Sequence, residues 1–254
     1  MARERKHKPK PRKRRRFGAI RKLLSTVLTV AAISGACLVF FRINQVEVAG
    51  NERYLAQDVV QASGIGPGGS LILLGQESAI DRILDQLPYV KSAEIQRALP
   101  DRVIIRIQEY EAAAVISGSP GGLWILASQG KILEQSDNPQ GLLQIFGLSA
   151  HQPVPGEYVA AESGLENRLN LVLELIQLLE ERDILRQCET LQCNNTFLML
   201  RYLSFDLKLP YHGDFGEMLN LLEKALESGE ITVGTEGVCD FTVTDGRMYF
   251  QRRK

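Results

Sequence analysis

The segment LLSTVLTVAAISGACLVFF, residues 23–41, decides how this chain of 254 residues is organised. It contains no charged residue, and Lys22 and Arg42 flank it. As an α-helix it would rise about 28 Å, close to the thickness of the hydrocarbon core of a bilayer. A charge at the centre of such a helix would cost at least about 2.5 kcal/mol. The segment therefore predicts a single transmembrane helix at residues 23–41.

The charges on either side predict the orientation of that helix. Residues 1–22 form a basic tail in which twelve Lys and Arg residues face only one acidic residue, Glu4. Beyond Arg42, 17 Lys and Arg residues face 29 Asp and Glu residues. Lys and Arg next to a membrane span are retained in the cytoplasm. We expect a protein that crosses the cytoplasmic membrane once, with residues 1–22 in the cytoplasm and the C-terminal part outside.

Other interpretations of the N-terminus fit the residues less well. A cleaved signal peptide has a shorter apolar region and a small-residue cleavage site, whereas this run ends in residues 38–41, LVFF. A lipoprotein site at Cys37 would need a branched aliphatic residue where Ser34 stands. The basic tail could bind nucleic acid, but the neighbouring span already explains its charge. We expect no nucleic-acid partner.

The cysteines do not indicate a disulfide framework. Cys37 falls within the predicted span, which leaves Cys188, Cys193 and Cys239, an odd number. If residues 184–192 form a strand, Cys188 and Cys193 lie about 16 Å apart and on opposite faces. A disulfide needs Cα atoms within about 7 Å of each other. The sequence leaves the state of these three thiols open.

A first block, residues 43–110, predicts a small sheet covered on one side by two helices. Residues 43–48, 90–99 and 102–107 alternate as strands do, with Pro100-Asp101 turning the chain between the last two. Residues 55–63 and 80–87 have apolar residues at helical spacing. Gly64 and Pro88 end these two helices.

This block also carries a resemblance to a known family. VEVAGNERYLAQDVVQASGIGPGGSLILL, residues 46–74, resembles the opening of a polypeptide-transport-associated (POTRA) domain. LPYVKSAEIQRALPDRVIIRIQEYEAAAV, residues 87–115, resembles its close. With a basic tail and a single span directly before it, the chain resembles the bacterial cell-division family FtsQ/DivIB. The resemblance implies a POTRA domain at residues 43–110 and a C-terminal β domain at residues 111–254.

The second block predicts a strand-rich domain, so that the whole chain has the α+β class. The predicted strands are residues 112–117, 123–127, 131–134, 142–148, 184–192, 196–209, 231–233 and 238–251, the last with a turn at Asp245-Gly246. Residues 165–182 predict a long helix. A second helix at residues 215–227 would be capped by Asp214.

No residue pattern indicates catalysis. The chain has no P-loop, HExxH, GxSxG or CxxC sequence. His212 stands near Asp214, but no nucleophile or metal-ligand spacing accompanies the pair. We therefore expect no enzyme, no cofactor, no metal and no small-molecule substrate. Two alternatives remain, a membrane-anchored cell-wall enzyme and a POTRA protein of outer-membrane assembly or secretion. The second would need repeated modules and long alternating strands.

The family resemblance implies a non-enzymatic scaffold at the division septum. Its partners would be divisome membrane proteins of the FtsB/DivIC and FtsL types, which link it to septal peptidoglycan synthesis. We expect a partner segment to add as a strand to the final sheet edge. The basic end at residues 252–254 would meet acidic partner residues. The predicted partner-binding residues are Phe241, Val243, Arg247, Met248, Tyr249 and Phe250. The alternative is that these residues complete the core.

Overall fold

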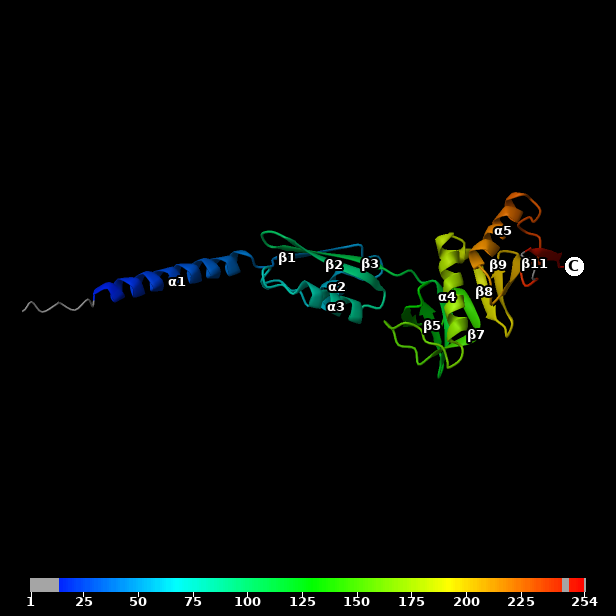
Figure 1. The fold of residues 1–254 in the computed structure, drawn as a ribbon, viewed down its shortest axis with the longest axis horizontal. Helices are drawn as coiled ribbons and strands as arrows, with labels where there is room; N and C mark the ends of the chain where they lie inside the picture. Colours follow the sequence, from blue (N-terminus) through cyan, green and yellow to red (C-terminus); the bar gives the residue numbers. More distant parts are fainter. Residues whose placement is uncertain (1–13, 244–246, 254) are drawn as a thin grey trace, which may run out of the picture.

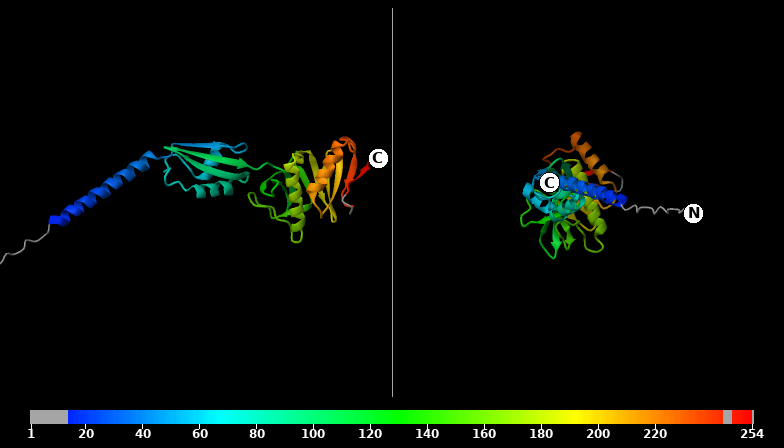
Figure 2. Two further views of the ribbon diagram at one scale, coloured as in Figure 1. Left: turned by 45° about the horizontal axis from the view of Figure 1, so that its top comes forward. Right: turned by 90° about the vertical axis from the view of Figure 1, so that its left-hand side faces the viewer.

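The computed structural model describes residues 14–243 and 247–253. The molecule is elongated, with a long helix, a three-stranded sheet and a nine-stranded sheet following one another (Figure 1). The left view of Figure 2 keeps this succession from the helix to the C-terminus, and the right view looks along the length of the molecule. The α+β class with one candidate membrane helix is confirmed. Most of the predicted basic tail and the Asp245-Gly246 turn lie outside the described residues.

Helix α1 (Arg14–Phe40) is the candidate span. Its apolar stretch Ile20–Cys37 is long enough to cross a membrane, and none of that stretch is buried against other elements. Leu28 and Val39 are 71% and 72% exposed. Such an unpartnered apolar helix is stable when lipid surrounds it. The protein is thus a single-pass membrane protein.

The first sheet has the predicted arrangement. Its strand order is β1-β3-β2, with β1 (Gln45–Ala49) parallel to β3 (Arg102–Glu109) and β2 (Val90–Ala98) antiparallel to it. Helices α2 (Ala56–Ser63) and α3 (Gln76–Gln86) cover one face. Alternate residues of the strands meet the helices in one core, whose fully buried members include Val59, Ile83, Val103 and Ile105. The alternation of apolar residues therefore predicted the buried face of the sheet correctly.

The second sheet has nine strands in the order β12-β11-β10-β9-β8-β7-β4-β5-β6. These are β4 (Ala114–Ser119), β5 (Leu123–Leu126), β6 (Ile132–Gln135), β7 (Leu143–His151), β8 (Cys188–Cys193), β9 (Phe197–Tyr202), β10 (Phe205–Pro210), β11 (Gly237–Asp240) and β12 (Tyr249–Arg252). Helices α4 (Glu166–Glu181) and α5 (Phe215–Glu227) pack on one face and form the largest core with it. Asp214 caps α5 as predicted, since its side chain accepts a hydrogen bond from the Glu217 amide.

Three predictions for this part were wrong. Residues 196–209 are two strands, because the chain turns at Leu203, which adopts a positive φ of 50°. The predicted strand 184–192 begins with a short 3-10 helix, Leu185–Gln187. Residues 231–233 form a loop in which Ile231 is buried. Ser204 follows Leu203, but no Gly, Pro, Asn or Asp stands directly beside it, so the local signal for the break was weak.

The predicted opposite placement of Cys188 and Cys193 was also wrong. A register shift between Cys188 and Thr190 adds a residue to β8. The irregularity returns the side chains to the same face, so that both thiols are buried in the large core. Both are free, as is the buried Cys239.

A small third core joins the two sheets. Tyr89, just before β2, is 4% exposed and packs with Val115, Ile125 and Leu133 of the second sheet. The Arg53 guanidinium lies 3.8 Å from the centre of the Tyr89 ring and 2.7 Å from Glu134 of β6. Aromatic burial combined with cation–π and ionic contact resists separation of the two parts.

Candidate partner-binding edge

Strand β12 is one edge of the nine-stranded sheet, and its only strand partner within the described residues is β11. Gly237 lies opposite Arg252, and Cys239 lies opposite Phe250. The Arg253 amide donates to the Glu236 carbonyl at 3.0 Å. Hydrogen-bonded pairs alternate along an antiparallel ladder, so the N–H and C=O groups of Phe250 and Arg252 point away from β11. These backbone groups face the outer side of the sheet edge.

The structure divides the six predicted residues into two groups. Phe241 is 7% exposed within the large core, and Met248 and Phe250 are partly buried against it. Val243 and Tyr249 are 43% and 42% exposed, and Arg247 is exposed as well. The first group therefore attaches the end of the chain to the core. The second group lies on the surface beside β12.

The Phe250 ring packs β12 against the core of the sheet. It meets the Phe205 ring edge to face, with 6.1 Å between the ring centres. It also lies directly over Gly237, where an added Cβ would collide with the ring. Glycine at this position of β11 makes room for the aromatic side chain of the neighbouring strand.

The face of β10–β12 away from the helices carries a chain of ion pairs. Lys208 of β10 contacts Asp240 of β11 at 2.8 Å. Arg201 and Arg253 contact Asp206 at 3.1 Å and 3.3 Å. Burial alone would raise the pKa of Asp240, but hydrogen bonds from Lys208 and Thr242 outweigh burial and lower that pKa. Asp240 is therefore ionised near neutrality and holds β10 and β11 together.

The opposite edge of the same sheet is covered. The Ile132 amide of β6 donates to the Glu157 carbonyl, and the Gly156 amide donates to the Ile132 carbonyl, both at 2.8 Å. The Val159 amide donates to the Gly130 carbonyl, also at 2.8 Å. The connector at residues 154–161 thus pairs with the outer side of β6. Edges that are covered in this way are protected from pairing with another chain.

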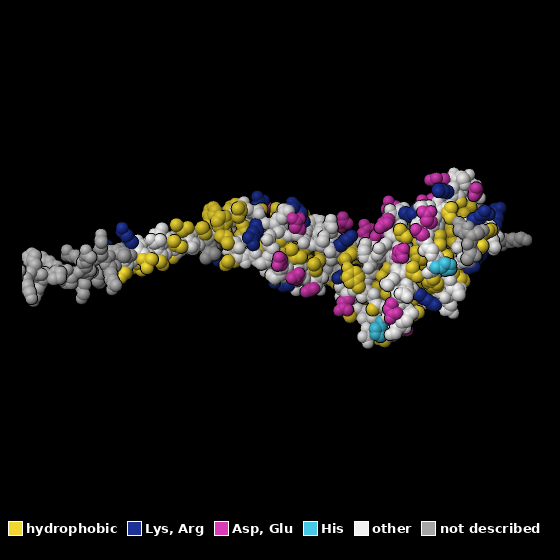
Figure 3. All heavy atoms as spheres, viewed as in Figure 1, with side chains coloured by type: hydrophobic (Ala, Val, Ile, Leu, Met, Phe, Trp, Pro, Cys, Tyr) yellow, Lys and Arg dark blue, Asp and Glu magenta, His cyan; other side chains and the backbone are white. Residues whose placement is uncertain are grey.

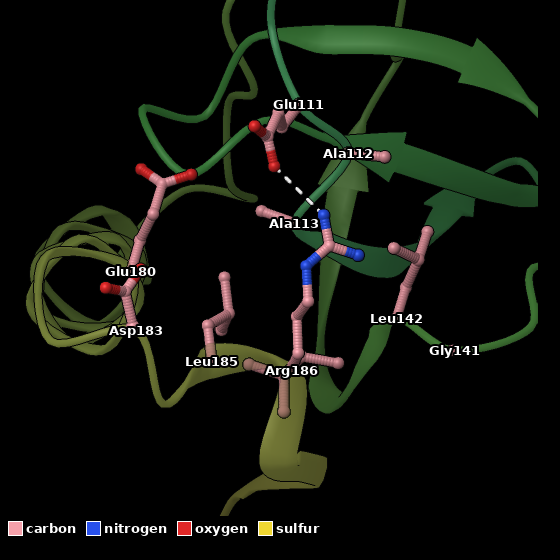
Figure 4. A pocket seen from close by; sticks show the side chains of 10 residues that line it. Glu111, Ala112, Ala113, Gly141, Leu142, Glu180, Asp183, Leu185 and Arg186 are labelled. Atoms are coloured by element: carbon pink, nitrogen blue, oxygen red, sulfur yellow. Dashed lines mark hydrogen bonds and ion pairs between the residues drawn. The ribbon is translucent and has the colours of Figure 1, made fainter.

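A hollow beside the link between the two sheets is shown in Figure 4. Arg186 Nη2 contacts Glu111 Oε2 across it at 2.9 Å, and both side chains are about three quarters exposed. The ten described residues that line it include no His, Cys, Ser or Thr. Its carboxylates, Glu111, Glu180 and Asp183, are accompanied in the described lining by no Ser, Thr, Cys or His, and the exposed Glu111–Arg186 ion pair by itself offers little chemistry.

The thiols do not supply a nucleophile either. Burial raises the pKa of Cys188 and Cys193 to about 12 and that of Cys239 to about 11. Thiols with such a pKa stay protonated near neutrality and are unreactive. Across the described part of the chain, no three His, Cys, Asp or Glu residues gather as metal ligands would.

The sequence predicted that the final segment forms a sheet edge, but it did not predict which of its backbone groups point outward. The outward backbone groups of Phe250 and Arg252 depend on the register with β11, which no local pattern fixes. The cover at the start of β6 comes from the connector at residues 154–161, for which the sequence predicted no strand or helix. One residue could have indicated how β12 packs. Gly237 is a glycine beside an alternating apolar segment, which is typical of a close approach by a neighbouring side chain.

Comparison with known proteins agrees with this architecture. The family model described as "POTRA domain, FtsQ-type" matches residues 41–110. The cell division protein DivIB of Clostridium tetani is 23% identical over 83% of this chain and 80% of its own length. FtsQ of Syntrophotalea carbinolica is 24% identical over 87% of this chain and 79% of its own length. FtsQ of Corynebacterium glutamicum is 26% identical over 63% of this chain and 73% of its own length.

These relatives share the name of cell-division proteins, and their matches extend well beyond the first sheet. The matched domain covers the β1–β3 sheet with its two helices, immediately after the membrane helix. The order of span, POTRA domain and strand-rich part is the one that the sequence predicted. The chain is thus similar to the FtsQ and DivIB cell-division proteins over most of its length, and residues 41–110 match the FtsQ-type POTRA domain.

Proposed function

We propose that this protein is a non-enzymatic scaffold of the division machinery that captures a partner segment by strand addition to β12. The partners would be single-span coiled-coil proteins of the FtsB/DivIC and FtsL types, which lead to septal peptidoglycan synthesis. The observation that carries the proposal is the outer side of β12, where the backbone groups of Phe250 and Arg252 face away from β11. Backbone pairing would give affinity, and the neighbouring exposed Val243 and Tyr249 would give selectivity.

The proposal places residues 1–22 in the cytoplasm and both folded parts outside it, at the division septum. The twelve basic residues of the tail support this orientation. Residues 43–110 and 111–254 would act as separate domains, since each sheet has its own core. The catalytic alternative has less support, because the described lining of the hollow at Glu111 holds no Ser, Thr, Cys or His beside its carboxylates, and Cys188, Cys193 and Cys239 are buried.

A proline at Arg252 tests strand addition directly. Proline lacks the N–H, and at Arg252 that group points outward rather than into the β11 ladder. Proline is tolerated in edge strands at such positions. We expect Arg252→Pro in the full chain to weaken capture of the coiled-coil partners by about tenfold or more, since it removes one hydrogen bond and adds a clashing ring.

The matched control is Arg252→Ala, which removes the charge but keeps the N–H. It should retain most of the affinity if backbone pairing dominates. Hydrogen exchange of the β11 amides should be the same in both variants, which shows that the sheet itself is intact. Equal partner capture by Arg252→Pro and the unchanged chain would contradict strand addition at β12.

A further inference from the structure

Three exposed apolar side chains gather at the end of the first sheet that adjoins α1. Ile72 and Leu73 lie in the loop before α3 and are 47% and 75% exposed. Leu99 lies in the turn between β2 and β3 and is 69% exposed. We call these three residues the apolar tip. Figure 3 shows hydrophobic side chains concentrated over this junction of α1 and the first sheet.

Both loops of the apolar tip are attached to the chain immediately after α1. The Leu71 amide donates to the Phe41 carbonyl at 2.9 Å, so the first loop lies against the end of the helix. The Asn44 amide donates to the Asp101 carbonyl at 2.8 Å, which fixes the β2–β3 turn beside the same segment. The position of the apolar tip relative to α1 is therefore set by backbone hydrogen bonds.

The Arg97 side chain joins β2 to the loop that carries Ile72 and Leu73. Arg97, near the end of β2, donates from Nη2 to the Leu74 carbonyl at 2.7 Å. Arg97 and the nearby Arg42 are both exposed and border the apolar residues. Arg side chains at the edge of an apolar surface extend their charged ends toward lipid headgroups.

The depth of the helix in a bilayer places this tip at the membrane surface. The charge-free part of α1 runs from Leu23 to its end at Phe40. Eighteen helical residues rise about 27 Å, close to the thickness of the hydrocarbon core. Phe41 then lies at the boundary of the hydrocarbon, and the loop that pairs with Phe41 lies at the same depth. Single exposed apolar residues are ordinary, whereas three at one membrane-facing end indicate a contact surface.

We propose that the apolar tip inserts into the interface of the bilayer that α1 crosses, on the side where α1 ends. The POTRA domain would then have two attachments to the membrane, the covalent one through α1 and a lipid contact through Ile72, Leu73 and Leu99. Two attachments restrict the tilt of the domain, which a single flexible link would not do. The proposal rests on the membrane span alone and does not depend on partner capture by β12.

The test uses the full chain in nanodiscs of phosphatidylcholine and phosphatidylglycerol, with no other protein present. A spin label is placed at Leu73→Cys or Leu99→Cys in a Cys37→Ala background, where the remaining three cysteines are buried. The matched control is Leu55→Cys, because Leu55 is 68% exposed but adjoins the opposite end of the same sheet. Collision with lipid-soluble oxygen and with a water-soluble nickel chelate is measured at each label.

We expect the labels at Leu73 and Leu99 to collide more with oxygen than with nickel, and the label at Leu55 to show the reverse. A second measurement uses the double variant Leu73→Asp and Leu99→Asp, in which hydrogen exchange at residues 70–74 should become faster in nanodiscs. A label at either tip position that behaves like the label at Leu55 would overturn the proposal. Unchanged exchange in the double variant would overturn it as well.

Discussion

The two edges of the nine-stranded sheet differ in what covers them. At β6 the connector at residues 154–161 pairs with the start of the strand, with hydrogen bonds to Gly130 and Ile132. At β12, in the part of the chain that the structure describes, the outer side has no strand against it. An uncovered edge invites pairing with other chains, and proteins usually protect against it. Within the described residues, the sheet therefore has one edge that a connector partly covers and one edge that no strand covers.

The edges also differ in how they are held. Strand β6 contributes Leu133 to the small core that also contains Tyr89. Strand β12 has four residues, and its main side-chain attachment is Phe250. An edge strand of that kind can adjust to an incoming segment, while the sheet beneath it stays fixed. Three predictions test this difference.

The largest effect is expected from Phe250→Ala. The substitution removes the ring from its contacts with Phe205 and Gly237. We expect a loss of about 3 kcal/mol in the free energy of unfolding of the distal part, at the low end for a buried aromatic residue. Partner capture should disappear. Hydrogen exchange should rise at Val238 and Asp240 and stay unchanged at β6, and an equal rise at both edges would remove the distinction between them.

A smaller effect is expected from Val159→Pro at the covered edge. Proline removes the N–H that donates to the Gly130 carbonyl, which leaves that carbonyl without its partner. The expected loss is about 2 kcal/mol in the free energy of unfolding. Exchange should rise at residues 130–132, while partner capture is retained. Loss of capture in this variant would show that the two edges are not independent.

The smallest effect is expected from acid. The pKa of Asp240 is lowered in the folded protein, so its contribution to stability is present above its ordinary pKa of 3.8 and is lost as the pH falls below it. Between about pH 5 and pH 3, amide exchange in β11 should therefore rise more than exchange in β6. Lys208→Gln removes the main partner of Asp240 and should reduce this pH dependence. An identical acid response in that variant would exclude the Lys208 contact as its cause.

Prediction from the sequence succeeded where local chemistry determines the backbone. Gly64 adopts a positive φ of 68° at the end of α2, and Asp214 caps α5 through the Glu217 amide. Alternation in β3 identified Val103, Ile105 and Ile107 as buried. These features depend on a few neighbouring residues, and their types carry the signal.

Prediction failed where distant contacts determine the backbone. The turn at Leu203 has only Ser204, and no Gly, Pro, Asn or Asp, directly beside it, and the hairpin is held by pairing of β9 with β10. The register shift in β8 that brings Cys188 and Cys193 to one face depends on β9. The open edge is of the same kind, because β12 was found as a strand but its outer side is defined by eight other strands.

The elongated shape restricts which proteins can reach β12. The strand lies near the C-terminus, at the end of the molecule farthest from α1 (Figure 1). A binding protein that has its own membrane anchor must carry its strand-forming segment on a stalk about as long as both folded parts together. Under the strand addition proposed above, an anchored partner with a shorter stalk would not reach β12, whatever its sequence. The length of the body would then select among candidates before any side chain is recognised.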